Sequence, residues 1–186
     1  MILGRTRDPT ADWTRLLDEH SRAVEQYRIA AGQVHSSQWT APVAPGKWSP
    51  AEITAHLAQA YALLSTELNG GTGMRLRGSR LQRLVLRHTM LPRILRGAPF
   101  PPGVRAPREI RPDHIMEDRP TALADLASRA ERFARALTAK STTKGVRLTH
   151  AYFGPLTPRQ GLELSIVHTR HHAQQLAAIH RSPPSS

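Results

Sequence analysis

The chain has no cysteine among its 186 residues. Disulfides, thiolate metal sites and a sulfur nucleophile carried by the protein itself are therefore excluded. Any thiol chemistry would have to bring its thiol in with a substrate or a cofactor. The length suits one domain with its own core, so we expect a single domain over residues 1–181.

Long apolar runs are missing as well. No run approaches the roughly 18 residues that are needed to cross a bilayer. The first residues also lack the apolar segment of a secretory signal. We therefore expect a cytoplasmic protein with no membrane partner.

Acidic residues are scarce in one stretch of a chain whose net charge is +12. From Met74 to Arg111 there are ten arginines and a single acid, Glu109, so nine of the twelve net charges lie here. Phe100 is the only aromatic residue, and no nucleic-acid motif is present. Because 23 of the 26 basic residues are arginine, a bias typical of genome composition, the favoured interpretation is a solvated face. A groove for an anionic small molecule comes second and nucleic acid last. The candidates for such a groove are Arg75, Arg77 and Arg80.

Strand-like alternation is scarce, whereas alanine, leucine, arginine and glutamate recur at helical spacing, which favours an all-α fold. Four amphipathic helices indicate a four-helix bundle. Two of them begin with a capping box followed by proline, which assigns Glu52 to a capping role. A basic insert at residues 74–118 should add one short helix, which Pro92 kinks or ends, and a long loop. The expected helices are 9–31, 49–69, 119–139 and 157–180, with the short helix at 79–95, the loop at 97–112 and a disordered tail at 182–186.

Three of the ten histidines suggest a metal site. His168 and His172 lie one helical turn apart on a face that should point into the bundle. His56 lies on the apolar face of the second helix. Burying three imidazoles without a partner is costly, and a shared cation relieves that cost. We predict that the three bind a divalent ion with at least one open position, and zinc or nickel suits these ligands best.

Other candidate residues have weaker support. His171 projects a quarter turn away from the pair and either binds substrate or meets solvent. For His20 core packing is favoured over a role at the metal, and for Tyr152 packing is favoured over proton donation. No motif supplies a general base, and Glu163 could point inward or outward. Thr169 stands where H-E-x-x-H metalloproteases have glutamate, which disfavours a zinc peptidase.

Two segments resemble a known family. Lys47-Trp-Ser-Pro-Ala-Glu-Ile-Thr-Ala-His56 resembles the second-helix motif of the DinB/YfiT-like superfamily. The segment that starts at His150-Ala-Tyr-Phe-Gly-Pro-Leu-Thr and ends at His168-Thr-Arg-His-His172-Ala-Gln-Gln resembles the fourth-helix motif. The resemblance spans most of the chain and is sharp over about forty residues.

The resemblance implies a four-helix bundle with a metal held by His56, His168 and His172. It further implies a thiol-dependent S-transferase or isomerase that uses a low-molecular-weight thiol such as mycothiol or bacillithiol. A metal-dependent hydrolase, or a bundle that binds a metal or small ligand without turnover, is the alternative. The expected partners are a small-molecule substrate, anionic if the arginines bind it, and a second copy in a homodimer.

Overall fold

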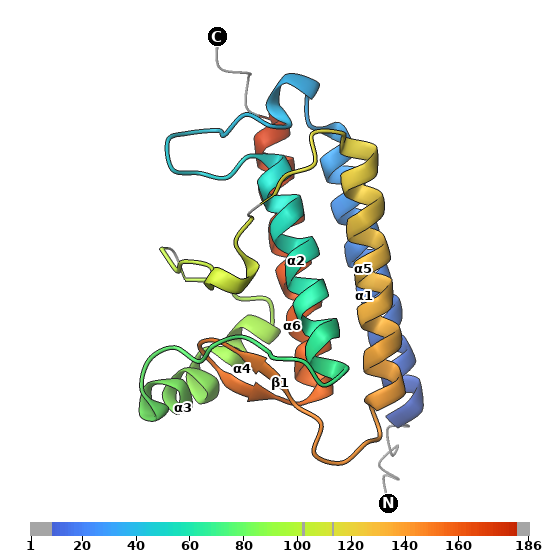
Figure 1. The fold of residues 1–186 in the computed structure, drawn as a ribbon, viewed down its shortest axis with the longest axis vertical. Helices are drawn as coiled ribbons and strands as arrows, with labels where there is room; N and C mark the ends of the chain where they lie inside the picture. The colour runs from blue at the N-terminus through green and yellow to red at the C-terminus, as the bar shows by residue number, and fades with distance from the viewer. Residues whose placement is uncertain (1–8, 102, 113, 182–186) are drawn as a thin grey trace, which may run out of the picture.

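Four long helices form the body of the molecule (Figure 1). They are α1 (Pro9–Gln33), α2 (Pro50–Leu68), α5 (Arg119–Lys140) and α6 (Pro158–Arg181). The computed structural model describes residues 9–101, 103–112 and 114–181, so the tail predicted at 182–186 lies outside the described residues. The prediction of an all-α bundle is confirmed.

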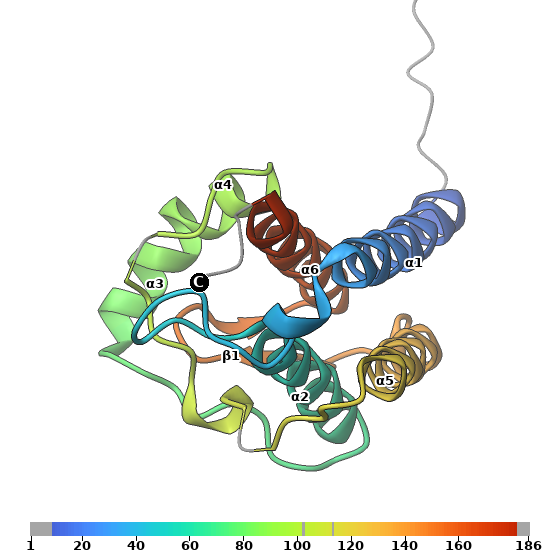
Figure 2. The same cartoon turned by 90° about the horizontal axis from the view of Figure 1, so that it is seen from above.

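The directions of the four long helices explain why α2 and α5 are so far apart in sequence. Figure 1 shows α1 and α6 running one way and α2 and α5 running the other way. Helix α1 packs along α6 and α2 packs along α5, and Figure 2 shows the four helices from above. Because α2 and α5 run in the same direction, the chain must return along the whole of α2, about 29 Å at 1.5 Å per residue. Residues 69–118 make this return, and we call them the crossover.

The core lies between the four helices and includes the aromatic and aliphatic side chains of α5. Phe133, Leu126 and Leu137 are fully buried, and each such side chain stabilises the fold by roughly 1.5–3 kcal/mol. Two hydroxyl groups in the core, from α1 and α2, are paired. Tyr27 lies 2.7 Å from the Thr54 hydroxyl, which itself donates to a backbone carbonyl at the start of α2.

Local capping fixes where two of the long helices begin, as predicted. The Ser49 hydroxyl accepts from the Glu52 amide at 3.2 Å, and the Glu52 carboxylate accepts from the Ser49 amide at 2.7 Å. Thr157 and Gln160 form the same reciprocal pair at the start of α6. Each box satisfies two amides that a helix start leaves without a partner.

The crossover contains two short helices where one was predicted. Helix α3 (Arg80–Thr89) and helix α4 (Leu91–Leu95) divide at Met90, and Pro92 lies in the first turn of α4. The helix predicted at 79–95 is therefore interrupted at Met90, two residues before Pro92, where the sequence predicted a kink or an end. The long loop after α4 is irregular apart from a 3-10 turn, η2 (Arg108–Ile110). Another 3-10 turn, η1 (Ser36–Gln38), follows α1.

A two-stranded antiparallel hairpin precedes α6 and was not predicted. It consists of β1 (Leu148–His150) and β2 (Gly154–Leu156). The Glu67 carboxylate of α2 accepts from the Thr149 amide at 3.0 and 2.9 Å, and this contact fixes the hairpin to the bundle. Among the described residues, no helix is both long and apolar enough to cross a membrane.

Candidate metal centre

The three predicted histidines come together between α2 and α6. The Nε2 atom of His168 lies 3.2 Å from Nε2 of His56 and 3.1 Å from Nε2 of His172. One ring nitrogen from each residue lies within 4.8 Å of the others. His56 and His172 are buried and His168 is half-buried. The convergence expected from the sequence is therefore present.

Hydrogen bonds at the far side of two rings determine which nitrogen is free. His56 Nδ1 lies 2.6 Å from the carbonyl oxygen of Ile110, which can only accept, so Nδ1 carries the hydrogen. His172 Nδ1 lies 3.0 Å from the side-chain oxygen of Gln175 and donates in the same way. In the neutral rings both Nε2 atoms therefore present a lone pair to His168. The single N–H that His168 Nε2 can offer satisfies only one of them.

A divalent cation fits this arrangement better than a proton does. Burial lowers the pKa of His56, and burial followed by the neighbouring histidines lowers the pKa of His168 well below its usual value. Burial lowers the pKa of His172 to about 3. The rings are therefore neutral near pH 7 and supply lone pairs. Ligands at 2.0–2.1 Å from a tetrahedral ion lie about 3.3 Å apart, close to the separations of 3.1 and 3.2 Å between the Nε2 atoms.

A cavity of about 820 Å³ opens beside the three histidines. Its walls come from the bundle, from the hairpin and from the crossover, and they are mainly apolar. Trp48 lies against the His56 ring with centroids 4.8 Å apart, and Phe100 lies edge-on to the His168 ring at 5.8 Å. Apolar side chains from α3, from α4 and from the residue between them also line the cavity: Leu86, Ile94 and Met90.

Comparison with known proteins identifies the family of the chain. A family model described as the DinB superfamily matches residues 19–176, which is most of the chain. The chain belongs to the DinB superfamily. A search of the curated proteins found no match, and a search of the solved structures found none either. The DinB assignment suggested by the two sequence motifs is thereby confirmed.

His150 is a polar group of this DinB site that the sequence reasoning missed. It ends β1, lines the cavity, and stacks on Phe153 with ring centroids 4.5 Å apart. Its Nδ1 accepts from the backbone amides of Tyr152 and Phe153, both at 3.3 Å, so Nε2 carries the hydrogen. Burial lowers its pKa to about 4. His150 is therefore a neutral, oriented donor, and its only signal in the sequence was its place in the family motif.

Two histidines with open roles are placed by the structure. His171 is half-buried and lines the cavity, with its ring 5.2 Å from that of Phe100, so it faces the site. His20 lies in the core instead. Its Nε2 is 3.0 Å from the Tyr61 hydroxyl, which lies 2.7 Å from the Thr169 hydroxyl. This network joins α1, α2 and α6, as the core-packing interpretation of His20 predicted.

The basic residues of the cavity differ from those proposed from sequence. Arg75, Arg77 and Arg80 do not line it, whereas Arg105 and Arg111 do. Both of these side chains are exposed, as is that of Lys47, which also lines the cavity. The Tyr152 hydroxyl donates to the carbonyl oxygen of Arg105 at 2.8 Å. Tyr152 therefore ties the crossover to the hairpin, consistent with its predicted packing role.

Carboxylates do not contribute to the walls that the described residues form around this cavity. Glu52 is used by its capping box. Glu163, whose orientation the sequence left open, pairs with Arg159 one turn earlier at 2.9 Å. Neither glutamate lines the site. The ionisable groups that do so are histidines, the two tyrosines Tyr61 and Tyr152, and the basic residues Lys47, Arg105 and Arg111.

Proposed function

We propose that this DinB protein is a divalent-metal-dependent enzyme that transfers or rearranges an organic electrophile with the help of a low-molecular-weight thiol. His56, His168 and His172 would hold the ion, and zinc or nickel suits three neutral imidazoles. An ion bound there supplies Lewis acidity and lowers the pKa of a thiol, which makes a thiolate accessible near neutral pH. One observation carries the proposal: imidazole lone pairs converge beside an apolar cavity.

The absence of an acidic side chain from the described walls favours a thiol over water as the nucleophile. Activation of water commonly uses a carboxylate as general base. A thiol needs less help, because its pKa lies closer to neutrality than that of water. With no cysteine in the chain, the thiol has to arrive from solution. A metal-dependent hydrolase is the second candidate, supported by His171, whose ring lines the cavity and could accept a proton.

The remaining residues would position the substrate and exclude water. Trp48 and Phe100 flank the ligand rings and favour a substrate with an apolar or aromatic body. The Nε2–H of His150 can donate to a carbonyl or leaving-group oxygen in the cavity. Arg105 and Arg111 are placed to bind an anionic end of the substrate.

Metal analysis comes first in the test of this proposal, on protein purified without a histidine tag. We expect about one zinc or nickel ion per chain. His172→Ala should abolish binding and leave helical content intact, whereas the exposed His35 can be replaced by alanine as a matched control. Wild-type protein that takes up no divalent ion would refute the proposal.

Activity is then measured on the metal-loaded protein. One panel combines thiols with apolar electrophiles, and a second contains esters and amides. Turnover in the first panel that is lost in His172→Ala supports the thiol transferase or isomerase. Turnover confined to the second panel supports the hydrolase. Full occupancy without turnover in either panel would indicate a binding bundle. The homodimer and the cytoplasmic location stay predictions.

A further inference from the structure

Helix α3 carries apolar side chains on two opposite faces, and only one face is covered. Leu86 and Met90 point inward, where they are partly buried and line the cavity. Leu81, Leu84 and Val85 lie on the other face and are 69%, 54% and 51% exposed. Their spacing of three and four residues makes them one continuous stripe. We call these three side chains the outer stripe.

The surroundings of the outer stripe are basic. The chain has no acidic residue between Glu67 and Glu109. Arg80 on α3 is exposed, and so are Arg93 and Arg96 on or beside α4. Exposed leucine and valine side chains on a segment that carries cations and no anions form an amphipathic cationic face. Such a face matches a layer that is apolar inside and negatively charged at its surface.

The helix is held so that the outer stripe stays outward. Arg83 donates to the carbonyl oxygens of Gly78 at 2.6 Å and Arg77 at 3.3 Å. Arg87 donates to the carbonyl oxygen of Pro155 in β2. A capping box between Ser79 and Gln82 fixes the start of the helix. The Arg87 contact ties α3 to the hairpin, and the Arg83 contacts and the capping box tie its first turn to the preceding residues, so together they restrain the rotation of the helix about its axis.

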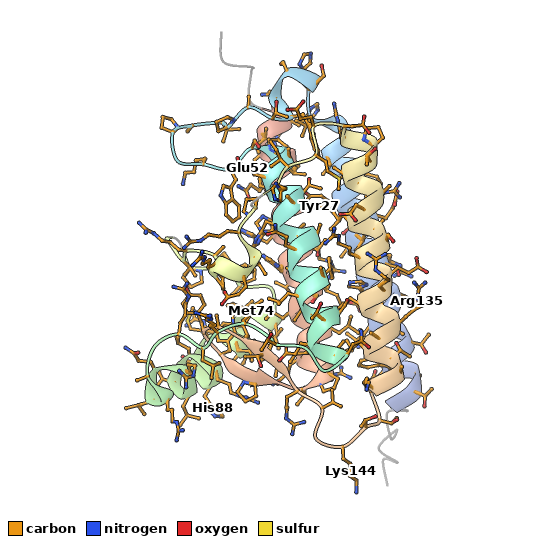
Figure 3. The ribbon with its side chains drawn as sticks, viewed as in Figure 1. Tyr27, Glu52, Met74, His88, Arg135 and Lys144 are labelled. Carbon is orange, nitrogen blue, oxygen red and sulfur yellow. The ribbon has the colours of Figure 1, made fainter. Side chains whose placement is uncertain are left out.

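We propose that the outer stripe and its neighbouring arginines dock this protein on the surface of a membrane that contains anionic lipids. Three apolar side chains would enter the interfacial layer while arginines contact lipid headgroups. The sequence predicted no membrane partner because no apolar run can span a bilayer. A helix that lies in the interface does not need such a run. Figures 2 and 3 place α3, with the labelled His88, on the opposite side of the molecule from α5, with the labelled Arg135.

Other occupants fit this face less well. A second copy of the chain, docked by the same face, would bring arginines against arginines without an acid to offset them. Nucleic acid would satisfy the arginines, but its phosphates offer nothing to Leu81, Leu84 and Val85. An anionic lipid layer satisfies both the charge and the apolar surface.

The docking is tested by sedimentation with phosphatidylcholine vesicles, with and without phosphatidylglycerol, in the presence of EDTA. The chelator separates this question from the metal-dependent function. We expect at least about tenfold stronger partition to the vesicles that contain phosphatidylglycerol, falling as salt rises from about 0.1 to 0.5 M. Equal partition to both vesicles, or no partition to either, would overturn the proposal.

Matched variants assign the binding to the outer stripe. Combining Leu81→Ser, Leu84→Ser and Val85→Ser should weaken partition about tenfold or more. Ile29→Ser is the control, since Ile29 is 55% exposed on α1. If the triple variant binds vesicles as well as the wild type does, the assignment to α3 is wrong.

A second set of variants and probes separates lipid from the other occupants. Arg80→Gln and Arg93→Gln should each weaken partition about fivefold, whereas the exposed Arg22→Gln on α1 should not. Circular dichroism checks that every variant keeps its helices. If the protein binds duplex DNA in a salt-dependent way and does not bind vesicles, the partner of this face is nucleic acid and not lipid. If the wild type forms a dimer that the triple serine variant does not form, and vesicle binding is absent, the outer stripe binds a second copy of the chain and not lipid.

Discussion

Gln175 should control metal affinity although its own side chain is not expected to bind the ion. Its side-chain oxygen accepts from His172 Nδ1 at 3.0 Å, and this contact directs the lone pair of Nε2 toward the other two rings. Gln175→Leu keeps a side chain of similar size and removes the acceptor. His172 then loses the partner that fixes its tautomer and ring orientation.

The expected magnitude follows from the contact that is lost. A neutral hydrogen bond contributes about 0.5–1.5 kcal/mol, which corresponds to roughly 2- to 13-fold in affinity. The loss of ring orientation adds to this, and partners of metal-ligating histidines typically change affinity 10- to 100-fold when mutated. We therefore expect metal binding to weaken about tenfold or more. Protonation of the ring does not add to this loss near pH 7, because the pKa of His172 is already low and the ring is neutral in both proteins.

Competition with a chromogenic chelator for zinc or nickel measures the effect. Gln174→Leu is the matched control, since Gln174 is the adjacent residue of the same type and is exposed. Gln175→Glu retains an acceptor and should keep wild-type affinity or exceed it. If Gln175→Leu binds zinc as tightly as the wild type, or if Gln174→Leu weakens binding as much, the proposed role of the contact is wrong.

Further predictions concern stability. Burial lowers the pKa of His20 to about 4 and of His172 to about 3. Below about pH 6.5 these histidines bind protons in the unfolded chain but not yet in the folded one, so metal-free protein should lose stability as the pH falls toward 4. In urea titrations the His20 contribution should fall by about 2–3 kcal/mol between pH 7 and pH 4.5, and His20→Phe should remove that part of the slope. An unchanged slope would contradict burial of a neutral ring. Gly161→Ala would place a methyl group in steric overlap with a side-chain carbon of the buried Leu148 and should cost about 1–3 kcal/mol in the same assay. Gly154 has φ of +72°, so Gly154→Ala should lower the free energy of unfolding by about 1 kcal/mol. A melting temperature equal to that of the wild type would exclude this strain.

The histidine cluster could be predicted because its signals are local. His168 and His172 share a face through their spacing alone, and the apolar neighbours of His56 require its face to be buried in the same core. The capping box of Ser49 and Glu52 fixes where α2 begins and therefore which of its residues point inward. In a bundle these constraints are enough to bring the three rings together.

The partners of the rings could not be predicted equally well. Gln175, three residues after His172, was within reach of a helical pattern. The carbonyl oxygen of Ile110 lies 54 residues from His56 in sequence, and a backbone acceptor has no signature in residue type. The hairpin that presents His150 was missed for a similar reason, since three-residue strands are too short to show alternation.

The arginines of the crossover have several roles, which the net charge of the segment could not predict. Arg83 and Arg87 fasten α3 to its surroundings, Arg105 and Arg111 line the cavity, and Arg80 remains exposed at the surface. These roles depend on the direction in which α2 and α5 run, because parallel helices require the returning chain to pass alongside the bundle, where it forms one wall of the cavity. The metal ligands belong to the bundle, and much of the wall facing them belongs to the crossover. Substitutions in the crossover wall other than at Ile110 and Phe100, which contact the ligand rings, should therefore change which substrates bind without changing metal affinity.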